Sequence, residues 1–82
     1  MTILLLLLGC AEVSQTPTCE QYVACLGARD EARGTTTDML RFEAQGDCWG
    51  SPAGADLCDR SCTNGLAWLR ESETDLPEAC SP

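Results

Sequence analysis

The sequence predicts an all-α fold, a small disulfide-stapled bundle of about three helices. The chain has 82 residues, which is room for one small domain whose core needs covalent support. Seven residues are cysteine, whereas one Phe, one Tyr and two Trp are the only aromatic residues, a composition typical of a disulfide scaffold. Apolar residues also recur with helical spacing in three segments.

The charge of the chain excludes two classes of partner. Thirteen Asp and Glu residues stand against five Arg, with no Lys and no His, so the net charge is −8. This charge repels phosphate backbones, and we expect no nucleic-acid partner. It also opposes adhesion to anionic lipid, so contact with a membrane needs another cause.

The opening run, residues 3–8, contains six consecutive apolar side chains. It is far shorter than the roughly 20 residues that span a bilayer and is typical of the apolar part of a secretory signal. The alternative is a buried strand or helical turn. Leu7-Leu8-Gly9-Cys10 resembles the lipobox of bacterial lipoproteins. The resemblance implies that residues 1–9 are a cleaved signal peptide and that Cys10 carries the lipid, including palmitate.

The segment before the apolar run lacks the basic residue that opens such a signal, since only Met1 and Thr2 precede it. We therefore expect the natural start to lie upstream of Met1.

The number of cysteines supports the lipobox independently, because an exported protein rarely retains an unpaired thiol. If Cys10 is set aside for lipid, six cysteines remain and can form three disulfides: Cys19, Cys25, Cys48, Cys58, Cys62 and Cys80.

Residues 10–17 are polar and short, and we interpret them as a tether to a disulfide-rich helical domain over 18–82. Thr18 and Gln21 have the spacing of a capping box. They predict a first helix from about Cys19 to Arg29, whose apolar stripe has the i, i+3, i+4, i+7 pattern.

The second predicted helix is short, from about Asp38 to Gln45. Its apolar side comes from Met39, Leu40 and Phe42, and Gly46 suits its C-terminal end.

The third predicted helix runs from Ser51-Pro52, a cap followed by proline at the first helical position, to about Ser72. One half of its helical wheel carries Leu57, Cys58, Ser61, Cys62, Gly65, Leu66, Trp68 and Leu69. Gly65 on this half lets a neighbouring backbone approach, or is simply tolerated at about 1 kcal/mol. Pro77 excludes a helix through the tail, which we expect to run back over the fold.

The cysteine spacing favours disulfides between segments, because Cys58 and Cys62 point from one helix face toward a neighbour. Antiparallel packing of the first and third helices predicts Cys19–Cys62 and Cys25–Cys58, leaving Cys48–Cys80. Six cysteines allow 15 pairings, and the others stay open. Zinc binding by Cys58 and Cys62 is the alternative in a reducing compartment, but an exported protein favours disulfides. We expect no metal and no other cofactor.

Catalysis finds little support in the sequence, and we expect the protein not to be an enzyme. It has neither His nor a nucleophile or phosphate-binding motif. Seven carboxylates are scattered as on a solvated face: Asp30, Glu31, Asp38, Glu43, Glu71, Glu73 and Asp75.

The two tryptophans are predicted to be buried. Trp49 packs against a disulfide, or else is exposed as an anchor for a partner. Trp68 shares the apolar half of the third helix.

These observations predict an exported lipoprotein, held in a membrane through lipid on Cys10 and acting as a non-catalytic binding or envelope-associated module with an unknown protein partner. Ala11 is not the Asp linked to inner-membrane retention, which favours the bacterial outer membrane. The alternative is a secreted-type effector such as an enzyme inhibitor, with a binding edge at 34–37 or 50–54.

Overall fold

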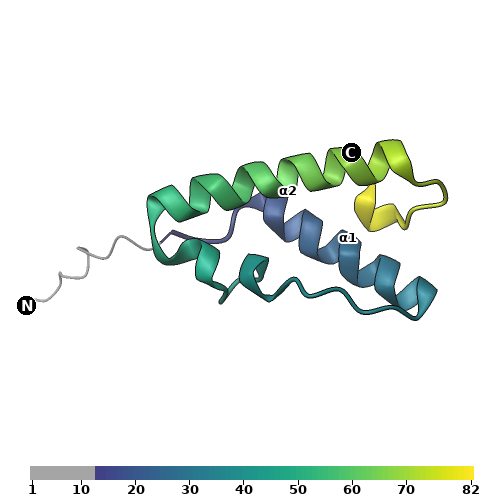
Figure 1. Cartoon of the computed structure of the whole chain (residues 1–82), viewed down its shortest axis with the longest axis horizontal. Coiled ribbons are helices and arrows are strands. Elements are labelled where there is room, and N and C mark those ends of the chain that lie inside the picture. The colour runs from purple at the N-terminus through teal and green to yellow at the C-terminus, as the bar shows by residue number, and fades with distance from the viewer. Residues whose placement is uncertain (1–12) are drawn as a thin grey trace, which may run out of the picture.

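The computed structural model describes residues 13–82, and within this range it is all-α, without strands (Figure 1). It has two long helices, α1 (Pro17–Arg33) and α2 (Pro52–Ser72). Three 3-10 turns complete it: η2 (Leu40–Phe42), η3 (Asp47–Gly50) and η4 (Glu78–Cys80). The all-α prediction is confirmed, whereas two long helices replace the predicted three.

Helix α1 begins before and ends after the predicted range. Its N-cap is Thr16, whose Oγ1 accepts from the backbone N–H of Cys19 at 3.2 Å, and Pro17 takes the first helical position. The predicted cap, Thr18, therefore lies inside the helix. The helix ends at Gly34, whose φ of 69° is left-handed and suits a residue without a Cβ.

The predicted helix over 38–45 is wrong, because only the short turn η2 forms there. The connection from Gly34 must return along the molecule to the start of α2 (Figure 1). The Asp38 carboxylate accepts from the Leu40 N–H at 3.2 Å, a local bond that competes with helix formation, and the backbone becomes extended at Glu43, with φ −72° and ψ 167°. Gly46 then closes a tight turn by donating its N–H to the Glu43 carbonyl at 2.8 Å.

Helix α2 has the predicted bounds. The Ser51 hydroxyl accepts from the Gly54 N–H at 3.1 Å, Pro52 follows at the first helical position, and the helix ends at Ser72.

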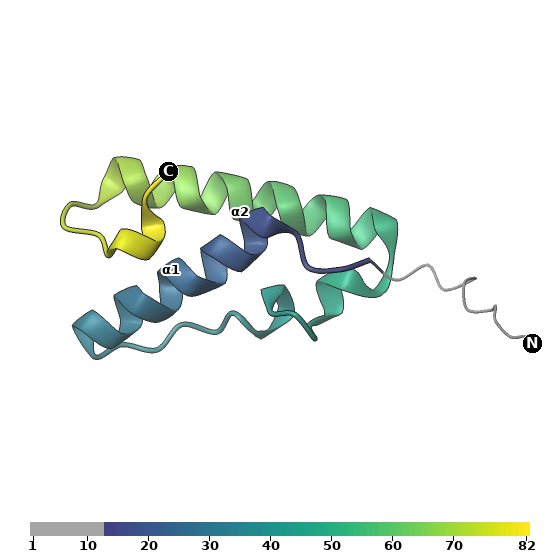
Figure 2. The same cartoon turned by 180° about the vertical axis from the view of Figure 1, so that it is seen from behind.

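The two helices run in the same direction, inclined to each other (Figures 1 and 2). Cys19 is bonded to Cys62, 43 residues further on, and Arg29 pairs with Glu73, 44 residues further on. The two pairs have nearly the same separation along the sequence, so a later residue of α1 faces a later residue of α2 and the helices are parallel. The predicted antiparallel packing is wrong, because a long return connection, and not a short loop, joins them.

The disulfides follow from this parallel register. Cys19–Cys62 is present as predicted, but Cys25–Cys80 and Cys48–Cys58 replace the predicted Cys25–Cys58 and Cys48–Cys80. Cys25 lies six residues, nearly two turns, after Cys19, whereas Cys58 lies four residues, about one turn, before Cys62. In parallel helices, Cys25 and Cys58 therefore lie on opposite sides of the Cys19–Cys62 bond and cannot reach each other. Each of them bonds a cysteine outside α1 and α2 instead.

The core is built around the disulfides. All six cysteines of residues 13–82 are at most 4% exposed. One cluster surrounds Cys19–Cys62 and Cys48–Cys58 and includes Trp49, and a second surrounds Cys25–Cys80. Trp49 is 4% exposed and its Nε1 donates to the Glu43 carbonyl at 2.8 Å, so its predicted burial is confirmed.

The tail returns over the helices, as expected. Gln21 Nε2 donates to the carbonyls of Ala79 and Ser81 at 3.2 and 2.6 Å, and Arg70 Nε donates to the Cys80 carbonyl at 2.7 Å. At the other end, the predicted tether is attached to the fold from Val13 onward, since the Val13 N–H donates to the Trp49 carbonyl at 3.0 Å.

Candidate interaction surface

The outer side of α2 carries two large apolar side chains in solvent. Leu57 is 62% exposed and Trp68 is 60% exposed. The predicted burial of Trp68 is wrong. The buried residues of α2 form a narrower stripe than the apolar half of its wheel: Ala55, Cys58, Cys62, Leu66 and Leu69. Because one helix and a few turns cover α2, the edge of its apolar half stays uncovered.

Leu57 and Trp68 lie on one line along α2. They are three turns apart, roughly 16 Å along the axis, and differ by about 20° around it. Ser61 and Asn64 are exposed on the same line between them. We call these four residues the α2 face: two apolar side chains separated by small polar ones.

Three of the five arginines are paired with carboxylates. Arg29 and Arg33 pair with Glu73, and Arg60 pairs with Asp56. Arg70 donates to the Cys80 carbonyl, and the guanidinium of Arg41 lies 5.5 Å from the centre of the Phe42 ring. With thirteen acidic residues in the chain, the surface presents a negative field to an approaching molecule.

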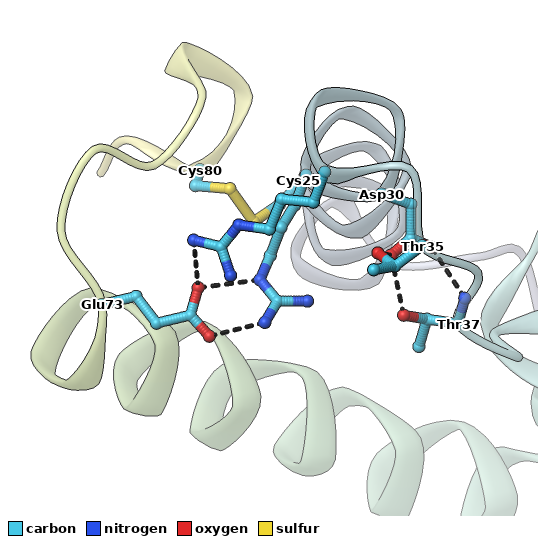
Figure 3. A network of polar contacts seen from close by, with 8 residues as sticks. Cys25, Asp30, Thr35, Thr37, Glu73 and Cys80 are labelled. Carbon is cyan, nitrogen blue, oxygen red and sulfur yellow. Dashed lines mark hydrogen bonds and ion pairs between the residues drawn. A yellow bond between two sulfur atoms is a disulfide. The ribbon is translucent and has the colours of Figure 1, made fainter.

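Glu73 joins the C-terminal ends of the two helices (Figure 3). Its carboxylate accepts from Arg29 Nε and Nη2, both at 2.7 Å, and lies 3.0 Å from Arg33 Nη2. The Glu73 side chain is 15% exposed. The hydrogen bonds from Arg29 lower its pKa, so the carboxylate is ionised at neutral pH.

Asp30 fixes the turn that follows α1 (Figure 3). Its carboxylate accepts from Thr35 Oγ1 at 2.8 Å, from the Thr37 N–H at 2.7 Å and from Thr37 Oγ1 at 2.9 Å. These bonds, that from Thr35 foremost, lower the pKa of Asp30. Asp30 is buried, so the sequence was misleading in placing it and Glu73 on a solvated face. In the sequence, the run of threonines after Gly34 was the feature that could have indicated hydrogen bonds to Asp30.

The predicted site residues are distributed as follows. Cys10 lies outside the described residues. Cys58 and Cys62 are each in a disulfide, so neither supplies a thiolate for the zinc alternative. Within residues 13–82, no three His, Cys, Asp or Glu side chains come together as metal ligands. Neither helix of this range has the length and apolarity that crossing a membrane requires.

The fold and surface together define a small, acidic, disulfide-stapled helical domain with one exposed apolar helix face. No protein-family model, curated protein or solved structure matches the chain.

Proposed function

We propose that the protein is an exported lipoprotein, held in a membrane by lipid on Cys10, and that its helical domain is a non-catalytic binding module of the cell envelope. The observation that carries this proposal is the closed set of disulfides. The six cysteines of residues 13–82 are all bonded to one another, so Cys10 has no cysteine of that range to pair with. Three disulfides also favour an oxidising, extracytoplasmic compartment.

The lipobox supports the anchor, and Ala11 supports the outer membrane as its destination. A diacylglyceryl group on Cys10, with an acyl chain on its amino group, exceeds the two lipid signals that stable anchoring takes.

The α2 face supports binding of a protein partner. Exposed Trp is enriched where partners bind most strongly, and Leu57 offers a second apolar contact three turns away. The negative field around the face favours a partner with basic residues beside an apolar stripe, such as an amphipathic helix.

Lipidation is tested by growing cells that express the full chain with labelled palmitate. We expect label in the wild-type protein, none in a Cys10→Ser variant, and a mature chain that begins at Cys10 by mass spectrometry. Equal labelling of the two proteins, or no labelling of either, would contradict the anchor.

Partner binding is tested by crosslinking and purification from intact outer membranes. Trp68→Ser and Leu57→Ser are expected to lose a partner that the wild type retains. Ala67→Ser is the matched control, because Ala67 is an exposed apolar residue of α2 that lies outside the α2 face. A partner that survives both α2 variants would show that another surface binds it.

The turn after α1 favours a second function, that of an enzyme inhibitor. Asp30 holds Thr35 and Thr37 while Thr36 between them is exposed, and a rigid exposed loop is what an inhibitor presents. The other edge considered, 50–54, is instead the capped start of α2. A screen against extracellular hydrolases tests this function: inhibition should be lost in Thr36→Trp and kept in Trp68→Ser.

A further inference from the structure

The segment before α1 is fixed to the fold almost up to the lipobox. The Val13 N–H donates to the Trp49 carbonyl at 3.0 Å, and Gln15 Nε2 donates to the Phe42 carbonyl at 2.7 Å. Three residue steps separate Val13 from Cys10. A fully extended chain covers at most about 11 Å in three steps.

This short reach restricts where a lipid-anchored domain can lie. The headgroup layer of a bilayer is itself several ångströms thick, roughly 5–7 Å on each side. A lipid on Cys10 therefore keeps Val13 within contact distance of the headgroups, whatever path the three residues take.

The surface around Val13 has exposed apolar groups that α1 and α2 leave uncovered. Val13 is 38% exposed and Leu40 is 67% exposed. They lie on either side of the turn at 45–47, which forms a wall of two shallow depressions of about 400 and 280 Å³. We call Val13, Leu40 and residues 45–47 the end surface. Its residue Asp47 begins η3, which leads directly into α2 at one end of the molecule (Figures 1 and 2).

The charged residues of the end surface favour one class of lipid headgroup over another. Asp38 and Asp47 line the same depression as Leu40, with Arg41 as the one basic residue in its lining. Two carboxylates against one guanidinium disfavour an anionic surface, whereas a zwitterionic headgroup presents an ammonium group to them.

We propose that the end surface rests on zwitterionic headgroups, of the phosphatidylethanolamine type, in the membrane that holds the lipid on Cys10. This inference rests on the proposed lipidation. Helix α2 then rises from the membrane, with Trp68 roughly 24 Å along the axis from Pro52, and the α2 face is presented to partners beyond the headgroups.

The two tryptophans report this orientation, because Trp49 lies beside the end surface and Trp68 lies far along α2. The full lipidated protein is reconstituted in vesicles of phosphatidylethanolamine and phosphatidylcholine that carry a dansyl headgroup as energy acceptor. Trp68→Phe leaves Trp49 as the donor, and Trp49→Phe leaves Trp68. We expect at least about threefold more efficient transfer from Trp49, given the roughly 24 Å helical rise that separates the two levels. Transfer that is equal, or greater from Trp68, would overturn the proposal.

Hydrogen exchange of the wild type provides a measurement that does not depend on the fold of Trp49→Phe. Amides of residues 38–47 should exchange more slowly on vesicles than in the soluble Cys10→Ser protein, with residues 57–68 unchanged. Protection confined to 57–68, or none at 38–47 in vesicle-bound protein, would contradict the orientation. A failure of the proposed lipidation would be recognised separately from a wrong orientation, because the protein would then not float with vesicles at all.

A matched pair of substitutions and a change of lipid complete the test. Leu40→Asp should reduce the transfer from Trp49, and Leu57→Asp should not. Vesicles rich in phosphatidylglycerol should also reduce it. Equal effects of the two substitutions, or stronger transfer on the anionic vesicles, would refute the end surface or its lipid preference.

Discussion

The ring of Tyr22 lies directly on Gly65, so that a Cβ placed on the glycine would be 2.6 Å from the ring. The same ring makes an edge-to-face contact with Phe42, with centroids 5.5 Å apart. Tyr22 therefore fills the space between α2 and the return connection. The expected close approach at Gly65 is real, but an aromatic side chain makes it, and not a backbone.

Gly65→Ala tests this contact. The added methyl group forces the ring away from Gly65, and overpacking of this kind costs about 1–3 kcal/mol, against roughly 1 kcal/mol gained in helix propensity. We expect a net loss of about 1 kcal/mol in the free energy of unfolding, measured by denaturant titration. Gly27→Ala is the control, because nothing lies within 4 Å of its added Cβ. It should gain about 0.5–1 kcal/mol, and equal effects at both sites would disprove the contact.

Acid should destabilise the protein through Glu73 and Asp30. Hydrogen bonds lower the pKa of each carboxyl in the folded chain, so each stabilises the fold above its unfolded pKa near 4. This contribution is lost as pH falls through the lower folded pKa. Melting temperatures should be level from about pH 5 to 7 and decrease below pH 4.

Glu73→Gln and Asp30→Asn should each make the decrease in melting temperature below pH 4 smaller than in the wild type. Glu71→Gln is the control, because Glu71 is exposed and its carboxylate makes no ion pair within residues 13–82. An acid profile that is the same in all three variants would assign the effect to other groups.

The disulfides should differ in their contribution to stability. Cys25–Cys80 joins residues 55 apart, and Cys48–Cys58 joins residues 10 apart. Loop-closure entropy predicts about 4 kcal/mol for the longer and about 2.7 kcal/mol for the shorter. Paired Cys→Ala variants, compared by urea midpoint, should therefore rank in that order. The reverse order would mean that packing around Trp49 matters more than chain entropy.

The two tryptophans should differ in their access to solvent. Trp49 is 4% exposed and Trp68 is 60% exposed. Acrylamide, which is uncharged and unaffected by the negative surface, should quench the emission of the Trp49→Phe variant much more strongly than that of Trp68→Phe. The emission maximum of Trp68→Phe should also lie at shorter wavelength. Similar quenching in both variants would contradict the exposure of the α2 face.

Local signals in the sequence predicted local structure well. Ser51 and Pro52 mark the start of α2, and the end at Ser72 follows from the tail and Pro77. The predicted start of α1 was two residues too late, because both Thr16 and Thr18 can serve as the N-cap. Pro17 favours Thr16, since proline is preferred at the first helical position.

Relations between elements were less predictable. The pairing of Cys25 depends on the direction of α1 relative to α2, and the direction depends on the path of the connection, which local periodicity does not encode. The exposure of Trp68 has a similar origin. Helical spacing indicates which side of α2 is apolar, but the neighbours that fold onto α2 decide how much of that side is covered.

The interlaced bridges make the chain tolerant of hydrolysis. Any single peptide bond between Cys19 and Cys80 can be cut, and the two fragments stay covalently joined, because Cys19–Cys62 and Cys25–Cys80 together span the whole interval. The exposed residues 35 and 36 of the return connection are the natural targets of a protease. A molecule cut there would gain only the mass of one water and remain a single covalent species until its disulfides are reduced. Reduction would then separate it into two peptides, so a first cleavage leaves a covalent record on the protein without releasing any part of it.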